Sequence, residues 1–310
     1  METRGNTPES VAERYARALD TLTEKLKRDR NVVAAILWGS VAYDTVWEKS
    51  DIDLTIVLDE GAGGEWLTLT EEGISIHASL AVRSEFRKLL GGSIQGSFAD
   101  STLARSRMLF CTDPALAAQY EERPRRLGER DQRVQLLRSG TDAIPPYDKA
   151  RKWLAVKDDL DTTTQWIIGT AVALARVEVF AAGENPGREV LPQAMALNPE
   201  FFHTVHAGLL AGPRDRAHLG AVLAGIGEYL DARTDLCFAP LLDFLAAAGA
   251  PVGSRELNQH FSRQLGMTGI DIACDWLVER GRLEKLGLPI RLSKSSRVSV
   301  DEAAYAAVQS

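Results

Sequence analysis

Residues 37–54 of the chain read LWGSVAYDTVWEKSDIDL, and this stretch decides the expected fold. An apolar run from Val32 to Trp38 ends at Gly39, which is the pattern of a buried strand that stops at a residue without a side chain. Ser40 then begins a short helix, whose free N–H groups favour an anion close to the glycine. The stretch therefore predicts a phosphate-binding turn at Gly39 and Ser40.

Two aspartates follow this turn. Asp51 comes eleven residues after Ser40, and Asp53 lies inside the apolar run from Ile52 to Leu58, which predicts a second strand. Because side chains alternate along a strand, both carboxylates are expected on one side of the sheet. Adjacent carboxylates repel each other unless they are protonated or bridged by cations, and hard oxygen ligands suit Mg²⁺. The spacing therefore indicates metal-assisted chemistry on a phosphate.

The flanking segments extend this pattern to a small domain. Residues 8–29 carry apolar residues at helical spacing and predict an amphipathic helix. Residues 74–82 alternate apolar and polar side chains and predict a third strand, with His77 on its polar side. The intervening residues 59–73 are rich in glycine and acids, and we expect a mobile hairpin connection there.

Gly39-Ser40, a spacer of ten residues and Asp51-Ile52-Asp53 together resemble the signature of the nucleotidyltransferase superfamily that includes DNA polymerase β. The resemblance is close over residues 30–60 and looser up to about residue 115. It implies that Asp51 and Asp53 hold two Mg²⁺ ions and that Gly39 and Ser40 bind the β- and γ-phosphates of a nucleoside triphosphate. It further implies transfer of a nucleoside monophosphate to an acceptor hydroxyl, with release of pyrophosphate.

The chain departs from the family at one position. Active members usually add a third carboxylate from an adjacent strand, but residues 74–82 contain no acid. His77 stands at the expected position, with Glu72 just before the strand and Glu85 just after it. Three interpretations stay open: His77 acts as a ligand or base, an acid from elsewhere completes the site, or the protein binds a nucleotide without turning it over.

A helical region is expected after the Pro145-Pro146 pair, beginning with one long helix over residues 147–182. Lys149 and Lys152 lie at the predicted start of this helix, where related enzymes often place a lysine on the triphosphate. Antibiotic-modifying nucleotidyltransferases, which the chain also resembles, take a general base from their helical domain. The resemblance offers Asp158 for that catalytic role, with Asp161 and Glu178 as alternatives.

The last 75 residues predict a winged helix-turn-helix. Helices are expected at 239–248, from a Ser254 cap to Gln264, and at 269–279, followed by strands at 281–286 and 290–300. The expected recognition helix is acidic, whereas Arg291, Lys294 and Arg297 give the wing a basic character. From residue 236 onward the chain has eight basic and eight acidic residues, so packing, dimerisation or substrate capping is favoured over DNA binding.

Length and composition bound these expectations. The 310 residues predict two or three domains, and 45% apolar with 25% charged residues is typical of a globular protein. Three widely spaced cysteines in apolar surroundings, with no secretory signal and no membrane span, favour reduced thiols and a cytoplasmic protein. A net charge of −7 disfavours nucleic acid as the main partner.

The predicted fold class is α+β: a nucleotidyltransferase domain over residues 1–115, an all-helical domain over 116–235 and a winged-helix module over 236–310. The favoured function is Mg²⁺-dependent transfer of a nucleotide to a small hydroxylated molecule, such as an antibiotic. One alternative is a nucleotide-binding regulator that uses the winged helix for DNA or protein contacts, and another is an enzyme that modifies a protein or tRNA. A homodimer is compatible with these hypotheses.

Overall fold

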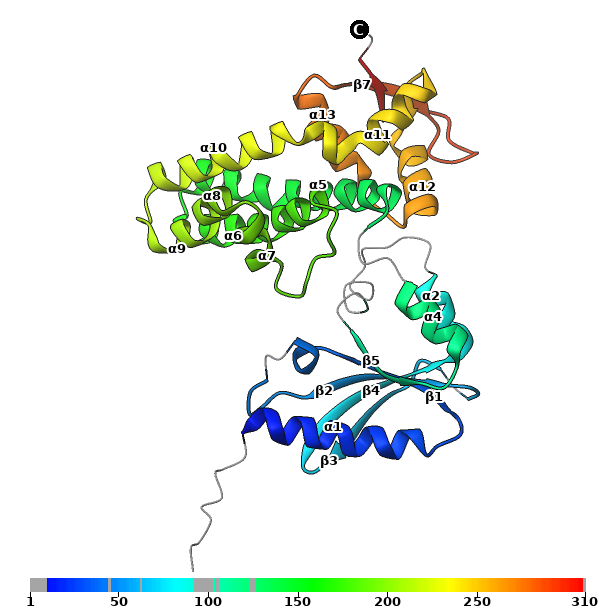
Figure 1. The fold of residues 1–310 in the computed structure, drawn as a ribbon. Helices are drawn as coiled ribbons and strands as arrows, with labels where there is room; N and C mark the ends of the chain where they lie inside the picture. The colour runs from blue at the N-terminus through cyan, green and yellow to red at the C-terminus, as the bar shows by residue number, and fades with distance from the viewer. Residues whose placement is uncertain are drawn as a thin grey trace, which may run out of the picture. The chain divides into compact units, whose positions relative to one another are not determined.

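In the computed structural model the chain divides into two compact units, Met1–Arg125 and Arg126–Ser310 (Figure 1). The structure describes residues 10–43, 46–61, 63–91, 103, 106–122 and 127–308. The first unit combines helices with a five-stranded sheet, and the second is largely helical. The α+β class is therefore confirmed, while the division near residue 235 stays a prediction.

The sheet of the first unit is mixed. It consists of β1 (Val32–Trp38), β2 (Ile52–Leu58), β3 (Trp66–Glu71), β4 (Ile74–Val82) and β5 (Arg107–Cys111), in the order β3-β4-β2-β1-β5. Strands β2 and β4 pair in parallel, and the other neighbours are antiparallel. The strands expected at 32–38, 52–58 and 74–82 are thus confirmed with their boundaries.

Helices cover the two faces of this sheet unequally (Figure 1). Helix α1 (Val11–Lys27) begins at a capping box formed by Ser10 and Glu13, and its apolar side packs on one face. The residues of this core include Tyr15, Leu19, Leu37, Ile52, Leu54, Ile74 and Ile76. Helices α2 (Arg83–Leu90) and α4 (Pro114–Glu122) pack on the other face. There they cover Val33 and Ile36 of β1 and Val57 of β2. The side chains of Asp53 and His77 belong to this second face by strand alternation.

The expected hairpin connection over residues 59–73 is present, but residues 66–71 within it form a strand, β3, that pairs with β4. Residues 66–71 alternate Trp, Thr and Thr with Leu, Leu and Glu, and pair with β4 across a two-residue turn. Both turn residues, Glu72 and Gly73, have positive φ, as a type I′ hairpin requires. The many glycines and acids around this segment concealed its period of two.

The second unit contains helices that share one hydrophobic core, which extends from Leu127 to Tyr305. The principal helices are α5 (Glu129–Lys152), α6 (Leu160–Ala181), α7 (Val190–Leu197), α10 (Arg216–Ala232) and α11 (Thr234–Ala248). Shorter elements are α8 (Pro199–Phe202), η3 (His203–Gly208) and α9 (Leu209–Ala211). Helices α5 and α6 make the most extensive contact among these elements.

The prediction of a single helix over residues 147–182 is wrong. Pro145 and Pro146 lie inside α5, which continues to Lys152 and ends in the π-helical turn η2 (Trp153–Lys157). Asp158 then adopts a left-handed conformation, and the side chain of Asp159 accepts a hydrogen bond from the Thr162 N–H at 2.9 Å to begin α6. The break arises because a left-handed residue followed by an N-cap ends one helix and starts another.

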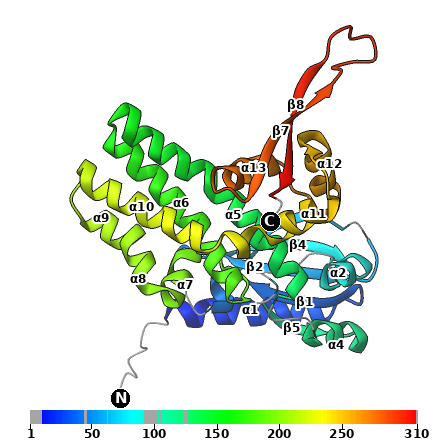
Figure 2. The same ribbon diagram turned by 90° about the horizontal axis from the view of Figure 1, so that it is seen from above.

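The C-terminal segment forms helices α12 (Ser254–Leu265) and α13 (Ile270–Glu279) and a sheet in the order β6-β8-β7. Strand β6 is Val252–Gly253, and β7 (Leu283–Ile290) and β8 (Val300–Ala307) form a long hairpin that extends from the helices of this unit (Figure 2). Two details differ from expectation. Ser254 is the first residue of α12 rather than its cap, and the second strand begins at Val300, so the three basic residues lie in the connection.

The three cysteines are free thiols, and burial raises the pKa of the Cys237 thiol to about 12. Among the described residues, no helix has the length and apolar character that crossing a bilayer demands.

Candidate active site

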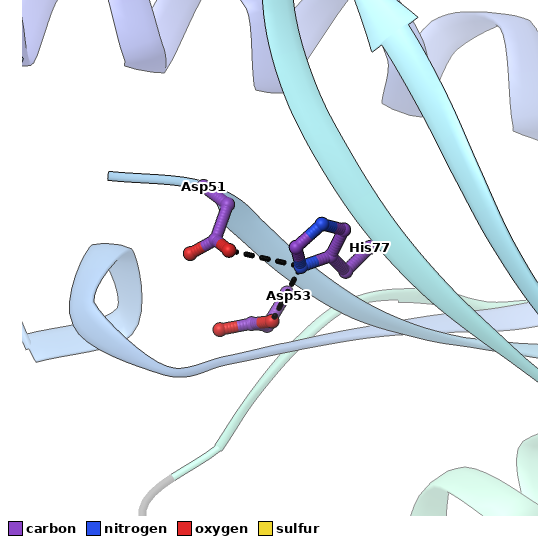
Figure 3. Close-up of side chains that lie close together, drawn as sticks. All are labelled: Asp51, Asp53 and His77. Carbon is purple, nitrogen blue, oxygen red and sulfur yellow. Dashed lines mark ion pairs between the residues drawn. The ribbon is translucent and has the colours of Figure 1, made fainter. Parts of the chain in front are cut away.

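Three side chains, at the start of β2 and on the neighbouring strand β4, lie close together (Figure 3). Asp53 is the second residue of β2, and Asp51 immediately precedes that strand. In the parallel ladder of β2 and β4, Asp53 is directly opposite His77. Because paired residues in a ladder point to the same face, the register itself brings the imidazole to the carboxylates.

We call Asp51, Asp53 and His77 the Asp-His cluster. The distances between their side chains suit either an ion pair or three ligands of one metal ion. Nδ1 of His77 lies 2.9 Å from Oδ2 of Asp51 and 3.9 Å from Oδ1 of Asp53. One ligand atom from each residue lies within 4.8 Å of the others, so the three side chains could surround one metal ion. Asp53 is the least exposed, at 18%, whereas Asp51 and His77 are each 42% exposed.

Gly39 lies directly against this cluster. It has a φ of +76°, and a Cβ atom at this position would lie 2.2 Å from Oδ2 of Asp53. Only a glycine therefore allows the end of β1 to pass so close to the Asp53 carboxylate. Ser40 opens the short 3₁₀ helix η1 (Ser40–Tyr43), as the sequence predicts, and its backbone follows Gly39 beside the cluster.

Hydrogen bonds to Ser50 position the segment that leads into Asp51. The Tyr15 hydroxyl of α1 donates to the Ser50 carbonyl, and the Trp47 N–H donates to the Ser50 hydroxyl at 3.1 Å. The Ser50 N–H in turn donates to the Trp47 carbonyl at 3.0 Å, which closes a turn. Asp51 thus follows a turn that is fixed to the helix behind the sheet.

The two other acids near β4 are engaged elsewhere. Glu72 forms an ion pair with Arg17 of α1 at 2.6 Å. Glu85 lies in the first turn of α2, where its carboxylate accepts from the Val82 N–H at 3.4 Å. His77 is therefore the residue that the structure brings to the third position of the cluster among the described strands.

Two tryptophans that the sequence reasoning missed lie on the same sheet face. Trp38 pairs with Asp53, Thr68 of β3 pairs with His77, and Trp66 is two residues from Thr68 on the same side of β3. The indole rings of Trp38 and Trp66 meet edge to face, with centroids 6.2 Å apart, and Trp66 is 65% exposed. The alternation of residues 66–70 was the signal that could have revealed this aromatic surface beside the cluster.

The remaining candidates belong to the second unit. Lys149 and Lys152 lie in the last turn of α5, not at the start of a helix as expected. Asp158, in its left-handed conformation, pairs with Arg216 at 2.5 Å, and Asp161 pairs with Arg214 at 3.4 Å. Roles of Lys149, Lys152 and Asp158 at the cluster of the first unit stay predictions.

Glu178 has a structural role that sequence reasoning did not anticipate. Its carboxylate accepts from the Tyr229 hydroxyl at 2.5 Å and pairs with Arg233 at 2.9 Å, and the Arg233 guanidinium stacks over the Tyr229 ring. Burial and the bond to Glu178 raise the pKa of Tyr229 far above its usual range. A carboxylate held this way supports the helical core, and a role of Glu178 as general base stays a prediction.

Comparison with known proteins agrees with this geometry. Residues 20–115 match the family model described as polymerase beta, nucleotidyltransferase. A solved structure of a nucleotidyltransferase-like protein from Exiguobacterium sibiricum 255-15 superposes with a TM-score of 0.61 at 14% identity, covering 95% of this chain and 100% of that one. The sequence matches none of the curated proteins.

The fold and the cluster define the first unit as a polymerase-β-type nucleotidyltransferase domain. Such a domain implies a nucleotide substrate. The likeness to the bacterial nucleotidyltransferase-like protein extends over both units and, at this identity, concerns the fold alone.

Proposed function

We propose that this protein transfers a nucleoside monophosphate from a nucleoside triphosphate to a hydroxyl of a small molecule and releases pyrophosphate. The observation that carries the proposal is the Asp-His cluster directly beside Gly39, in a domain of the nucleotidyltransferase type. In the reaction, the acceptor oxygen forms a bond to the α-phosphorus, and the bond from that phosphorus to the bridging oxygen of the β-phosphate breaks. The proton of the acceptor hydroxyl passes to a base, for which Asp158 is our candidate.

The donor set suits divalent cations. Two carboxylates and an imidazole nitrogen within 4.8 Å of one another supply ligand types that metal ions bind, and Asp51 and Asp53 would hold the metal. Bound Mg²⁺, with two ions expected, would lower the pKa of the acceptor hydroxyl and stabilise charge on the phosphates. The backbone at Gly39 and Ser40 binds the β- and γ-phosphates in this proposal, and Lys149 and Lys152 neutralise the triphosphate.

The position of the phosphates indicates where the acceptor enters. In an in-line displacement the attacking oxygen lies opposite the leaving pyrophosphate. With the pyrophosphate at the end of β1, the opposite side of the cluster is the β4–β3 side, since the sheet order is β3-β4-β2-β1. That side presents the exposed ring of Trp66, with the hydroxyl of Thr68 two residues along β3 and that of Ser79 opposite Trp66 on β4.

An aromatic ring bordered by small hydroxyl groups fits a small, ring-shaped polar molecule better than an extended polymer. This surface therefore supports a small hydroxylated acceptor, of which an antibiotic containing a sugar or cyclitol ring is an example.

The C-terminal segment supports a packing role more than DNA binding. The order α11, β6, α12, α13, β7 and β8 supports our proposal of a winged-helix module. In α13, Asp271 accepts from Asn258 at 3.1 Å and Asp275 pairs with Lys285 at 2.7 Å, so its polar positions are engaged within the module. A DNA-reading helix would need free basic or amide groups at such positions.

A labelled-nucleotide assay tests the proposed function. The purified protein is incubated with Mg²⁺, each of the four α-labelled ribonucleoside triphosphates and a panel comprising kanamycin, lincomycin, myo-inositol, glycerol, tRNA and protein. We expect a labelled small-molecule product and an equal amount of pyrophosphate, both of which Asp51→Asn and Asp53→Asn abolish. Binding of a nucleotide without pyrophosphate release would support the regulator instead, and labelled tRNA or protein would support the third hypothesis.

A further inference from the structure

The Asp-His cluster offers a metal ion one nitrogen donor beside two carboxylates. His77 presents Nδ1 to Asp51 at 2.9 Å and to Asp53 at 3.9 Å, so the nitrogen faces the same space as the carboxylate oxygens. Neighbouring ligands of a six-coordinate ion with bonds of about 2.1 Å lie about 3 Å apart. The Asp51–His77 distance therefore equals the separation of two ligands on one octahedral ion.

The register of the sheet, and not only a side-chain rotamer, brings His77 close to the two carboxylates. His77 lies in the middle of β4, between Ile76 and Ala78, which are both fully buried on the opposite face. The parallel ladder fixes it opposite Asp53. A nitrogen donor therefore lies on the same face as both carboxylates, within reach of an ion that binds them.

We propose that the ion held jointly by Asp51, Asp53 and His77 is Mn²⁺ in preference to Mg²⁺. Carboxylates suit both ions. Mg²⁺ is the harder ion and dehydrates reluctantly, so replacing one oxygen ligand with an imidazole nitrogen disfavours Mg²⁺ more than Mn²⁺. Mn²⁺ keeps the octahedral geometry and accepts both donor types. The inference deepens the proposed function, because it identifies the metal of the same site, while the triphosphate brings its own Mg²⁺.

Two substitutions separate the nitrogen from the charge of the ligand. His77→Asn replaces the nitrogen with a neutral amide oxygen, and His77→Asp replaces it with a charged oxygen. We compare the ratio of the Mg²⁺ dissociation constant to the Mn²⁺ dissociation constant, because an added charge changes both constants alike and leaves their ratio unchanged. His203→Asn, at an exposed histidine of the second unit, is the matched control for losing an imidazole.

The experiment measures binding of each metal alone to the full-length protein by calorimetry, and the ¹⁴N coupling of bound Mn²⁺ by pulsed electron paramagnetic resonance. We expect nitrogen coupling in the wild type and in His203→Asn, and none in the two His77 variants. We expect the ratio of dissociation constants to fall by about tenfold or more in both His77 variants. Circular dichroism confirms that the variants are folded.

Three results would overturn the inference: bound Mn²⁺ without nitrogen coupling in the wild type, an unchanged ratio in His77→Asn, or no Mn²⁺ binding at millimolar concentration. The first would leave His77 as an ion-pair partner of Asp51 only. Nitrogen-coupled Mn²⁺ without transfer from any nucleotide would refute the proposed function and leave this inference intact. Nucleotide transfer with Mg²⁺ but without nitrogen coupling of bound Mn²⁺ would refute this inference and leave the proposed function intact.

Discussion

Replacing Gly39 with alanine tests whether the end of β1 and the Asp-His cluster form one site. The new Cβ atom would lie 2.2 Å from Oδ2 of Asp53, 3.1 Å from its Cγ and 3.2 Å from its Cβ. Non-bonded heavy atoms rest about 3.5 Å apart, so the carboxylate must move by about 1 Å or turn away. The movement takes Asp53 out of the group of ligand atoms that now lie within 4.8 Å of one another.

The same substitution also strains the backbone, and Gly73 provides a matched control for that strain. Gly39 has a φ of +76° and Gly73 a φ of +78°, but a Cβ at Gly73 would meet no atom within 4 Å. In both variants a left-handed alanine costs about 1 to 2 kcal/mol. We therefore expect the backbone strain alone to lower the melting temperature of each variant by about 3 to 8 °C, and the clash with Asp53 adds to this effect in Gly39→Ala.

Activity should distinguish the two variants. Gly39→Ala is expected to reduce nucleotide transfer and metal affinity by about 100-fold, because displacing a ligand costs at least as much as removing its supporting contacts. Gly73→Ala should keep near wild-type activity below its melting temperature. Initial rates of pyrophosphate release and calorimetric metal titration give both quantities. Equal activity of the two variants would show that Gly39 is a turn residue without a part in the site.

Three further predictions concern other parts of the chain. Trp66→Ala should raise the KM for the acceptor about tenfold, equivalent to about 1.4 kcal/mol, with the KM for the nucleotide unchanged. Trp66→Phe should keep the stacking, and a raised nucleotide KM would instead place the base on this ring. Glu178→Ala should lower the free energy of unfolding by about 2 to 4 kcal/mol in urea titrations, since Tyr229 and Arg233 lose their partner; an unchanged stability with a lost kcat would make it the base after all. Hydrogen bonds from the Leu116 and Ala115 N–H groups hold the pKa of Asp113 below its usual range, so its stabilising effect is present above pH ~4 and is lost in more acidic solution. Urea titrations from pH 7 to pH 3 should show a difference of about 1 kcal/mol between the wild type and Asp113→Ala that shrinks with acidity; a constant difference would contradict this cause.

The central strands could be predicted because they are short, apolar and ended by clear signals. The run from Val32 to Trp38 stops at Gly39, and the run from Ile52 to Leu58 is apolar apart from Asp53 and Thr55. Burial on both faces of the sheet requires such runs. The position of the two aspartates followed from the same pattern, because a charge inside an apolar run is costly without a function or a partner.

The break between α5 and α6 could not be predicted from helical periodicity. Pro145 and Pro146 suggested that a helix ends before them, yet they lie within α5, and the actual break is at Asp158. Apolar residues recur at helical spacing on both sides of the break, so the pattern alone does not reveal it. The N-cap at Asp159 depends on one side-chain hydrogen bond, to the Thr162 N–H. In the sequence, Asp159 is one of three nearby aspartates and nothing distinguishes it as the cap.

The identity of the third residue in the cluster depends on a register that alternation alone does not determine. Alternation places Ser75, His77 and Ser79 on one face of β4, but any of the three could face Asp53. The structure selects His77 through the β2–β4 ladder, while the Glu72–Gly73 turn sets Thr68 opposite His77 and Trp66 opposite Ser79. A one-residue slip of β4 would turn Ala78 or Ile76 toward the carboxylates and leave them without a third donor. The hairpin that was expected to be a mobile connection therefore determines which side chains surround the cluster, and with them the space in which an acceptor can bind.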